Sequence, residues 1–142
     1  MQLADVNVLI NAFRPEVADH DRYRAWLEEL IGGDRRYAMS ELVLSAVVRT
    51  LTDHRIYARP ETIETALAYC EFLKNQPHCV LVHAGPRQWQ IFSRLCSEAE
   101  GRGRMVSDAY FAALAIEHGC EWITGEKHFA RFRGLRWRHP FA

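Results

Sequence analysis

Four acidic residues stand where predicted buried segments begin or end: Asp5, Glu41, Asp108 and Glu126. Asp5 follows a short apolar segment, whereas Glu41 and Asp108 lie in the first turns of predicted apolar helices. Glu126 comes two residues after the apolar segment that ends at Thr124. Each acid alone has a structural explanation, because carboxylates cap helices and are stabilised by helix dipoles.

The four acids together indicate a metal site. Clustered carboxylates repel one another, and a hard cation such as Mg²⁺ or Mn²⁺ neutralises them with oxygen ligands. Such ions activate water and stabilise a leaving oxygen during phosphodiester hydrolysis. We therefore take Asp5, Glu41, Asp108 and Glu126 as candidate metal ligands and catalytic residues.

Alternating short apolar and longer amphipathic segments predict an α/β fold with a mostly parallel sheet of about five strands. Strands are expected at residues 2–5, 37–39, 79–83, 120–124 and 135–137. Helices are expected at residues 6–13, 19–31, 40–51, 60–75, 86–99 and 108–118, with Pro60 opening the fourth and Ser107 capping the last. Ligands bind such sheets beyond the carboxyl ends of the strands, where the four acids are expected.

Composition and charge limit the class of protein that this sequence can form. The 142 residues are 49% hydrophobic and 25% charged, which is typical of a globular domain. The sequence has no run of about eighteen apolar residues and no basic residue before its first apolar segment, so neither a membrane span nor a signal peptide is predicted. We expect a cytoplasmic protein whose four cysteines are reduced thiols.

Net charge is zero, but it is unevenly distributed. All eighteen acidic residues lie at or before Glu126, and five basic residues follow it: Lys127, Arg131, Arg133, Arg136 and Arg138. A basic end could guide a phosphate backbone toward an acidic site, or could simply be a solvated surface. Charge alone favours the solvated surface.

The sequence resembles the VapC toxins, which are PIN-domain ribonucleases of type II toxin–antitoxin modules. The resemblance runs in order along nearly the whole chain, through the segments DVNVLI at 5–10, SELVLS at 40–45, VSDAY at 106–110, WIT at 122–124, FARF at 129–132 and GLRW at 134–137.

This resemblance implies one three-layer α/β/α PIN domain over residues 1–142. It implies Mg²⁺- or Mn²⁺-dependent endonucleolytic cleavage of RNA, with Asp5 and Asp108 as the best-matched ligands and Glu41 as the acid of the second helix. It also implies a VapB-type antitoxin partner and a homodimer. We expect five side chains to contact the substrate: Asn7, Arg102, Arg104, Thr124 and His128.

The sequence departs from the family where Thr124-Gly125-Glu126-Lys127-His128-Phe129 stands in place of the usual Thr-x-Asp-x-Asp-Phe. Glu126 can still reach a metal, whereas neutral His128 is a poor ligand for Mg²⁺ and an acceptable one for Mn²⁺. A catalytically weakened PIN domain that acts by binding RNA or its antitoxin is therefore the second hypothesis.

A third hypothesis is a phosphatase that uses Asp5 as its nucleophile. That chemistry calls for an Asp-x-Asp pair and a lysine near the phosphate. Position 7 is Asn, and the only lysines are Lys74 and Lys127. The sequence disfavours this hypothesis.

Overall fold

The computed structural model describes residues 1–142 and contains one parallel sheet of five strands. The strand order is β3-β2-β1-β4-β5, and every pair of neighbouring strands is parallel. The strands are β1 (Gln2–Ala4), β2 (Tyr37–Met39), β3 (Cys79–Leu81), β4 (Glu121–Ile123) and β5 (Trp137–Arg138). The predicted α/β class and strand number are confirmed.

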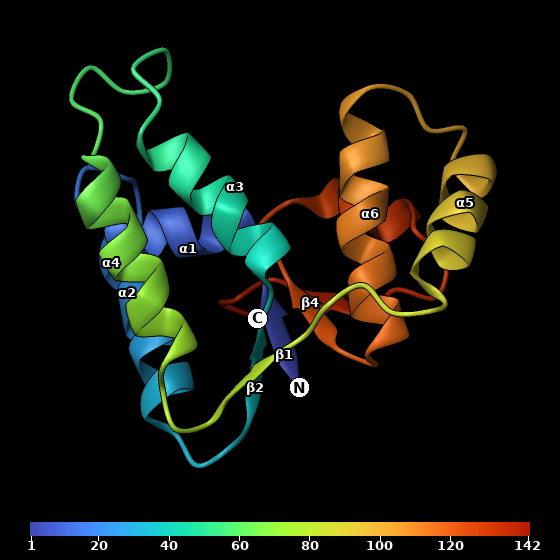
Figure 1. Cartoon of the computed structure of the whole chain (residues 1–142), viewed down its shortest axis with the longest axis horizontal. Helices are drawn as coiled ribbons and strands as arrows, with labels where there is room; N and C mark the ends of the chain where they lie inside the picture. The colour runs from blue at the N-terminus through green and yellow to red at the C-terminus, as the bar shows by residue number, and fades with distance from the viewer.

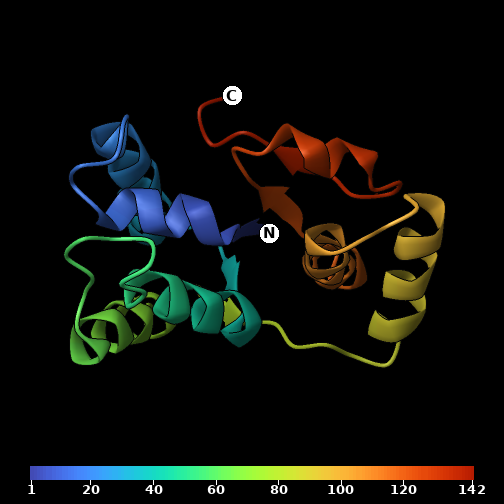
Figure 2. The ribbon, with the colours of Figure 1, turned by 90° about the horizontal axis from the view of Figure 1, so that it is seen from above.

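Six α-helices flank the sheet in two groups. The helices α1 (Val6–Phe13), α2 (His20–Gly32), α3 (Glu41–Leu51) and α4 (Ile63–Lys74) pack on one side (Figure 1). The helices α5 (Gln88–Glu98) and α6 (Arg104–Glu117) pack on the other, and a 3₁₀ helix, Lys127–Arg131, follows β4 (Figure 2). No helix combines the length and apolar character needed to cross a lipid bilayer.

The strands form the core because their residues are apolar on both faces. Leu3, Tyr37, Ala38, Trp122 and Ile123 are all fully buried. Continuous apolar strands are typical of parallel sheets that helices cover on both sides. This burial rules out a sheet with one solvated face.

The topology places a crevice beside β1. The chain runs from β1 outward through β2 to β3, then returns to place β4 on the opposite side of β1. Strand order therefore reverses between β1 and β4, and such a switch point opens a ligand crevice at the strands' carboxyl ends. Asp5 ends β1 and Thr124 ends β4, so both lie at this crevice.

Two predicted helix starts were wrong by three residues or more, and the others by at most two. Helix α4 begins at Ile63 rather than at Pro60, because Thr62 caps it through a hydrogen bond from the backbone N–H of Thr65. Helix α6 begins at Arg104, three residues before the predicted cap Ser107. The turn before α6 comes from Gly103, whose φ of 56° suits glycine.

Candidate active site

A cavity of about 800 Å³ lies at the carboxyl ends of β1 and β4, between α3 and α6. Its lining includes three of the four predicted acids: Asp5, Asp108 and Glu126. Asp5 directly follows β1, Glu126 follows β4, and Asp108 projects from the second turn of α6. Three separate elements thus bring their carboxylates to one place.

Asp5 is held rigidly at the bottom of this cavity. Its Oδ1 accepts a hydrogen bond from the backbone N–H of Val6 at 2.7 Å, which caps α1, and its Oδ2 accepts one from Thr124 Oγ1 at 2.7 Å. Burial raises the pKa of Asp5 to about 6, although the hydrogen bonds from Thr124 and Val6 oppose the shift. The negative charges of Glu126 and Asp108 raise this pKa further.

Asp108 lies deeper in its helix than the sequence predicted. Because α6 begins at Arg104, Asp108 comes after the first turn and faces the cavity instead of the helix terminus. Burial raises its pKa, the contact with His128 lowers it, and the charge of Glu126 raises it again. Two of the three carboxylates are therefore destabilised in their charged forms by burial and by each other.

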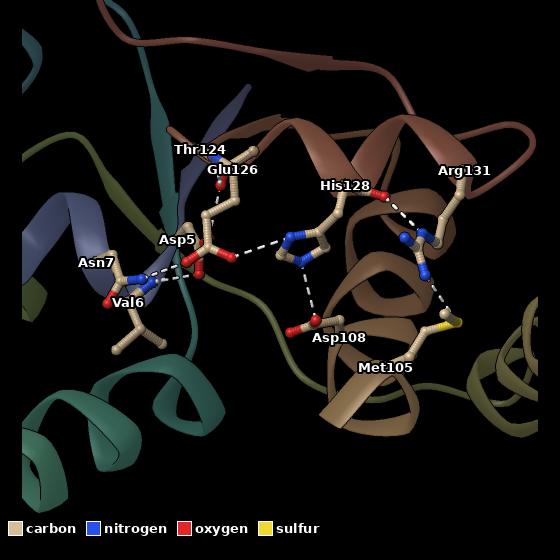
Figure 3. A network of polar contacts seen from close by, with 9 residues as sticks. All are labelled: Asp5, Val6, Asn7, Met105, Asp108, Thr124, Glu126, His128 and Arg131. Carbon is tan, nitrogen blue, oxygen red and sulfur yellow. Dashed lines mark hydrogen bonds and ion pairs between the residues drawn. The ribbon is translucent and has the colours of Figure 1, made fainter. Parts of the chain in front are cut away.

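Glu126 joins the two halves of the site (Figure 3). One of its carboxylate oxygens accepts a hydrogen bond from the Asn7 side-chain amide, and the other lies 3.2 Å from His128 Nδ1. The opposite ring nitrogen of His128 lies 2.9 Å from Asp108 Oδ2. The imidazole thus bridges Glu126 and Asp108.

The donor set is suited to a hard divalent cation. Three mutually repelling carboxylates and one amide oxygen are the ligand chemistry that Mg²⁺ and Mn²⁺ take. As placed, however, no three acidic, histidine or cysteine side chains converge on a single point. Glu126 and Asp108 turn instead to Asn7 and His128, so both carboxylates would have to turn inward to share an ion.

Glu41 is not brought to the cavity. It is the first residue of α3, as predicted, but its carboxylate binds Lys74 Nζ at 2.8 Å and is absent from the cavity lining. The cavity face of α3 carries Leu42, Ser45, Ala46 and Arg49 instead. Glu41 precedes Ser45 by four residues and so borders the same helix face, but its ion pair with Lys74 of α4 draws the carboxylate out of the cavity lining.

The predicted substrate contacts separate into three groups. Asn7 and Arg104 line the cavity, and His128 lies beside it, between Asp108 and Glu126. Thr124 is fully buried, so it cannot touch an RNA strand; its hydroxyl donates to Asp5 and accepts from the backbone N–H of Glu126. Arg102 is exposed in the loop before α6, outside the lining.

Arg49 lines the cavity, although the sequence pattern did not lead us to predict it as a site residue. Its side chain follows Leu42, Ser45 and Ala46 at helical spacings of seven, four and three residues. Residues at these spacings share one helix face. Once α3 was known to border the site, this pattern would have located Arg49.

Parts of the basic chain end lie at the edge of the sheet. Arg138 forms an ion pair with Glu121 at 3.2 Å, and Arg136 donates a hydrogen bond to the carbonyl of Gly119. Neither residue lines the cavity. These two arginines are therefore engaged at the edge of the sheet and do not contact a strand bound in the cavity.

The chain is similar to known proteins over nearly its whole length. A family model described as the PIN domain matches residues 3–135. The chain is 35% identical to VapC ribonuclease Mb2897 of Mycobacterium bovis over 99% of its own length and 95% of that protein. It is 34% identical to ribonuclease VapC25 of Mycobacterium tuberculosis over 99% of both chains.

A solved structure shares the fold. A chain in the crystal structure of VapBC2 from Rickettsia felis, bound to a DNA fragment from its promoter, superimposes with a TM-score of 0.72. The match covers 97% of both chains at 17% identity.

Proposed function

The chain belongs to the PIN domain family, and from this premise we propose that it is a VapC-type toxin, an endoribonuclease that cleaves RNA phosphodiester bonds with the help of Mg²⁺ or Mn²⁺. One observation carries the proposal. Asp5, Asp108 and Glu126 reach one cavity at the switch point of the sheet, in a chain about 35% identical over its length to proteins named VapC ribonucleases.

The proposed metal ligands are Asp5, Asp108 and Glu126. A bound divalent ion supplies Lewis acidity and an activated water for hydrolysis. The protein's own part is to hold these oxygens in place. Thr124 and the backbone N–H of Val6 fix both oxygens of Asp5, whereas Glu126 and Asp108 would turn from Asn7 and His128 toward the ion.

Cleavage by the purified full chain tests the proposal. We expect cleavage of single-stranded RNA with Mg²⁺ or Mn²⁺, and none with EDTA. Asp5→Asn and Asp108→Asn each remove a carboxylate charge at the cavity, so both should abolish cleavage. Glu64→Gln is a matched control, because Glu64 is exposed in the first turn of α4 and outside the cavity. Undiminished cleavage by the Asp5→Asn, Asp108→Asn double variant would contradict the assignment.

We further propose that a VapB-type antitoxin restrains the toxin in the cytoplasm and that the toxin forms a homodimer. The neighbouring solved folds include VapBC complexes, one from Rickettsia felis and one from nontypeable Haemophilus influenzae. Growth arrest on expression of the chain alone, relieved by co-expression of the small upstream reading frame, tests the antitoxin. Light scattering of the purified chain tests the dimer.

A catalytically weakened PIN domain is the second candidate, and His128 motivates it. Its imidazole bridges Asp108 and Glu126, so it occupies the space between two proposed ligands. This candidate predicts tight RNA binding without turnover. It also predicts that Glu126→Asp combined with His128→Asp restores cleavage. Full turnover by the unmodified chain would rule it out.

A further inference from the structure

The cavity has an acidic floor and basic walls. The floor carries the carboxylates of Asp5, Asp108 and Glu126. The two basic residues that line the cavity come from different helices: Arg49 from the last turn of α3, and Arg104 from the first position of α6. Without a metal ion the carboxylates of the floor repel an RNA backbone, so the basic walls supply the protein's own attraction for phosphates.

Both arginines are exposed, and neither makes a hydrogen bond or ion pair with another group of the protein. Three other basic side chains, by contrast, are paired with acids. Lys74 binds Glu41, Arg55 binds Asp53 and Arg94 binds Glu98. The guanidinium groups of Arg49 and Arg104 therefore keep all their donors available for a ligand.

The helices place these arginines on opposite sides. Helices α3 and α6 diverge from the sheet, and the end of α3 and the start of α6 both point away from it (Figure 1). Arg49 in the last turn of α3 and Arg104 at the first position of α6 thus belong to the helix ends that point away from the sheet. The hydroxyls of Thr50 and Ser107 add donors to the same walls, whereas the hydroxyl of Ser45 donates to the carbonyl of Leu42.

We propose that Arg49 and Arg104 form a two-sided clamp for the phosphates of an RNA strand, which holds the strand across the cavity with one phosphodiester over the carboxylates. This proposal rests on the proposed function and adds Arg49 as a substrate-positioning residue. A planar guanidinium binds a phosphate with two parallel hydrogen bonds, and such charge-assisted bonds are strong. Phosphates on either side of the cut site would meet one arginine each.

The test measures RNA binding without cleavage. Fluorescence anisotropy of a short labelled single-stranded RNA in EDTA compares the wild-type chain with Arg49→Ala and Arg104→Ala. Each variant should bind on the order of tenfold more weakly. Each should also reduce the slope of log affinity against log salt by about 0.7, the value for one lost contact to a single strand. Arg49→Lys should bind with intermediate affinity, because lysine keeps the positive charge but lacks the two parallel N–H donors of a guanidinium.

Arg35→Ala is the matched control. Arg35 is also exposed and unpaired, but it borders a separate hollow beside Met1 and Gln2, at the amino end of β1. The Arg35→Ala variant removes the same charge from the protein but leaves Arg49 and Arg104 unchanged. If the Arg49→Ala variant bound RNA as tightly as the Arg35→Ala variant, with the same salt slope, the proposal would be wrong.

Cleavage assays separate the clamp from the proposed function. With metal present, the clamp predicts that Arg49→Ala raises KM several times more than it lowers kcat. If cleavage requires Asp5 but the arginine variants bind RNA normally, the clamp is wrong and the ribonuclease stands. If the variants weaken binding but the wild-type chain never cleaves RNA, the clamp stands and the ribonuclease is wrong.

Discussion

At the scale of single residues, Thr124 shows how a buried hydroxyl shapes an active site that it never touches. Its side chain donates to Asp5 and accepts from the backbone of Glu126, at 2.7 Å and 3.0 Å. One residue at the end of β4 therefore sets the positions of two proposed ligands. Such supporting contacts orient ligands and are costly to remove.

Thr124→Val tests this role, because it keeps the shape of the side chain and removes the hydroxyl. The loss leaves Oδ2 of Asp5 and the N–H of Glu126 each without a partner, so we expect about 1–3 kcal/mol of destabilisation by urea denaturation. Cleavage should fall about 10- to 100-fold, as for other second-layer ligand contacts. Thr124→Ser retains the hydroxyl and should remain close to wild type. Equal activity of the two variants would contradict the role.

Glu41 yields the opposite prediction. The structure pairs it with Lys74 on the surface, away from the cavity. Glu41→Gln should therefore leave cleavage within about twofold of wild type, since exposed ion pairs contribute under 1 kcal/mol. If Glu41→Gln reduced cleavage as much as Asp108→Asn does in the same assay, Glu41 would have to be counted among the metal ligands.

At the scale of elements, sequence and structure agree where apolar patterning is strong. The central strands β1, β2 and β4 were predictable because they are short, largely apolar and buried, and Asp5 and Glu126 were located by following two of them. The start of α6 was not predictable from apolar periodicity, because Arg104 and Ser107 interrupt the pattern. The directions of the Glu41 and Arg49 side chains depend on the rotation of α3 about its own axis. Packing of α3 against the rest of the fold sets this rotation, so apolar periodicity alone could not predict it.

Gly103 controls where α6 begins, and with it the depth of Asp108. Its φ of 56° and ψ of −121° are strained for any residue with a Cβ. Gly103→Ala should cost about 1–3 kcal/mol of unfolding free energy, measured in urea, and should reduce cleavage by displacing Asp108. Gly101→Ala is the control, because a Cβ there meets only ordinary contacts at 3.6 Å. Equal stability of the two variants would show that α6 does not depend on this turn.

At the scale of the whole molecule, the central position of β1 joins both ends of the chain. β1 pairs with β2 on one side and with β4 on the other, and β4 in turn pairs with β5. Neither half of the chain can complete the sheet alone. This topology supports the proposal that residues 1–142 form a single domain.

A single domain of this kind should unfold in one step. Urea transitions followed by tryptophan fluorescence, which reports on buried Trp122, and by far-ultraviolet circular dichroism should have the same midpoint. The physical reason is that loss of β4 also removes a partner of β1. Two separated midpoints would show that the helical groups on the two sides unfold independently.

The pairing of β1 with β4 also has a consequence for the order of events during synthesis. Asp5 leaves the ribosome early, but the hydroxyl that orients it belongs to Thr124, which is made 119 residues later. At about 5–20 residues per second, a nascent chain spends several seconds or more without its active site. Contacts so distant in sequence also form slowly after release. A site built in this way cannot be completed before residue 126 has been made, and the interval gives a binding partner time to arrive.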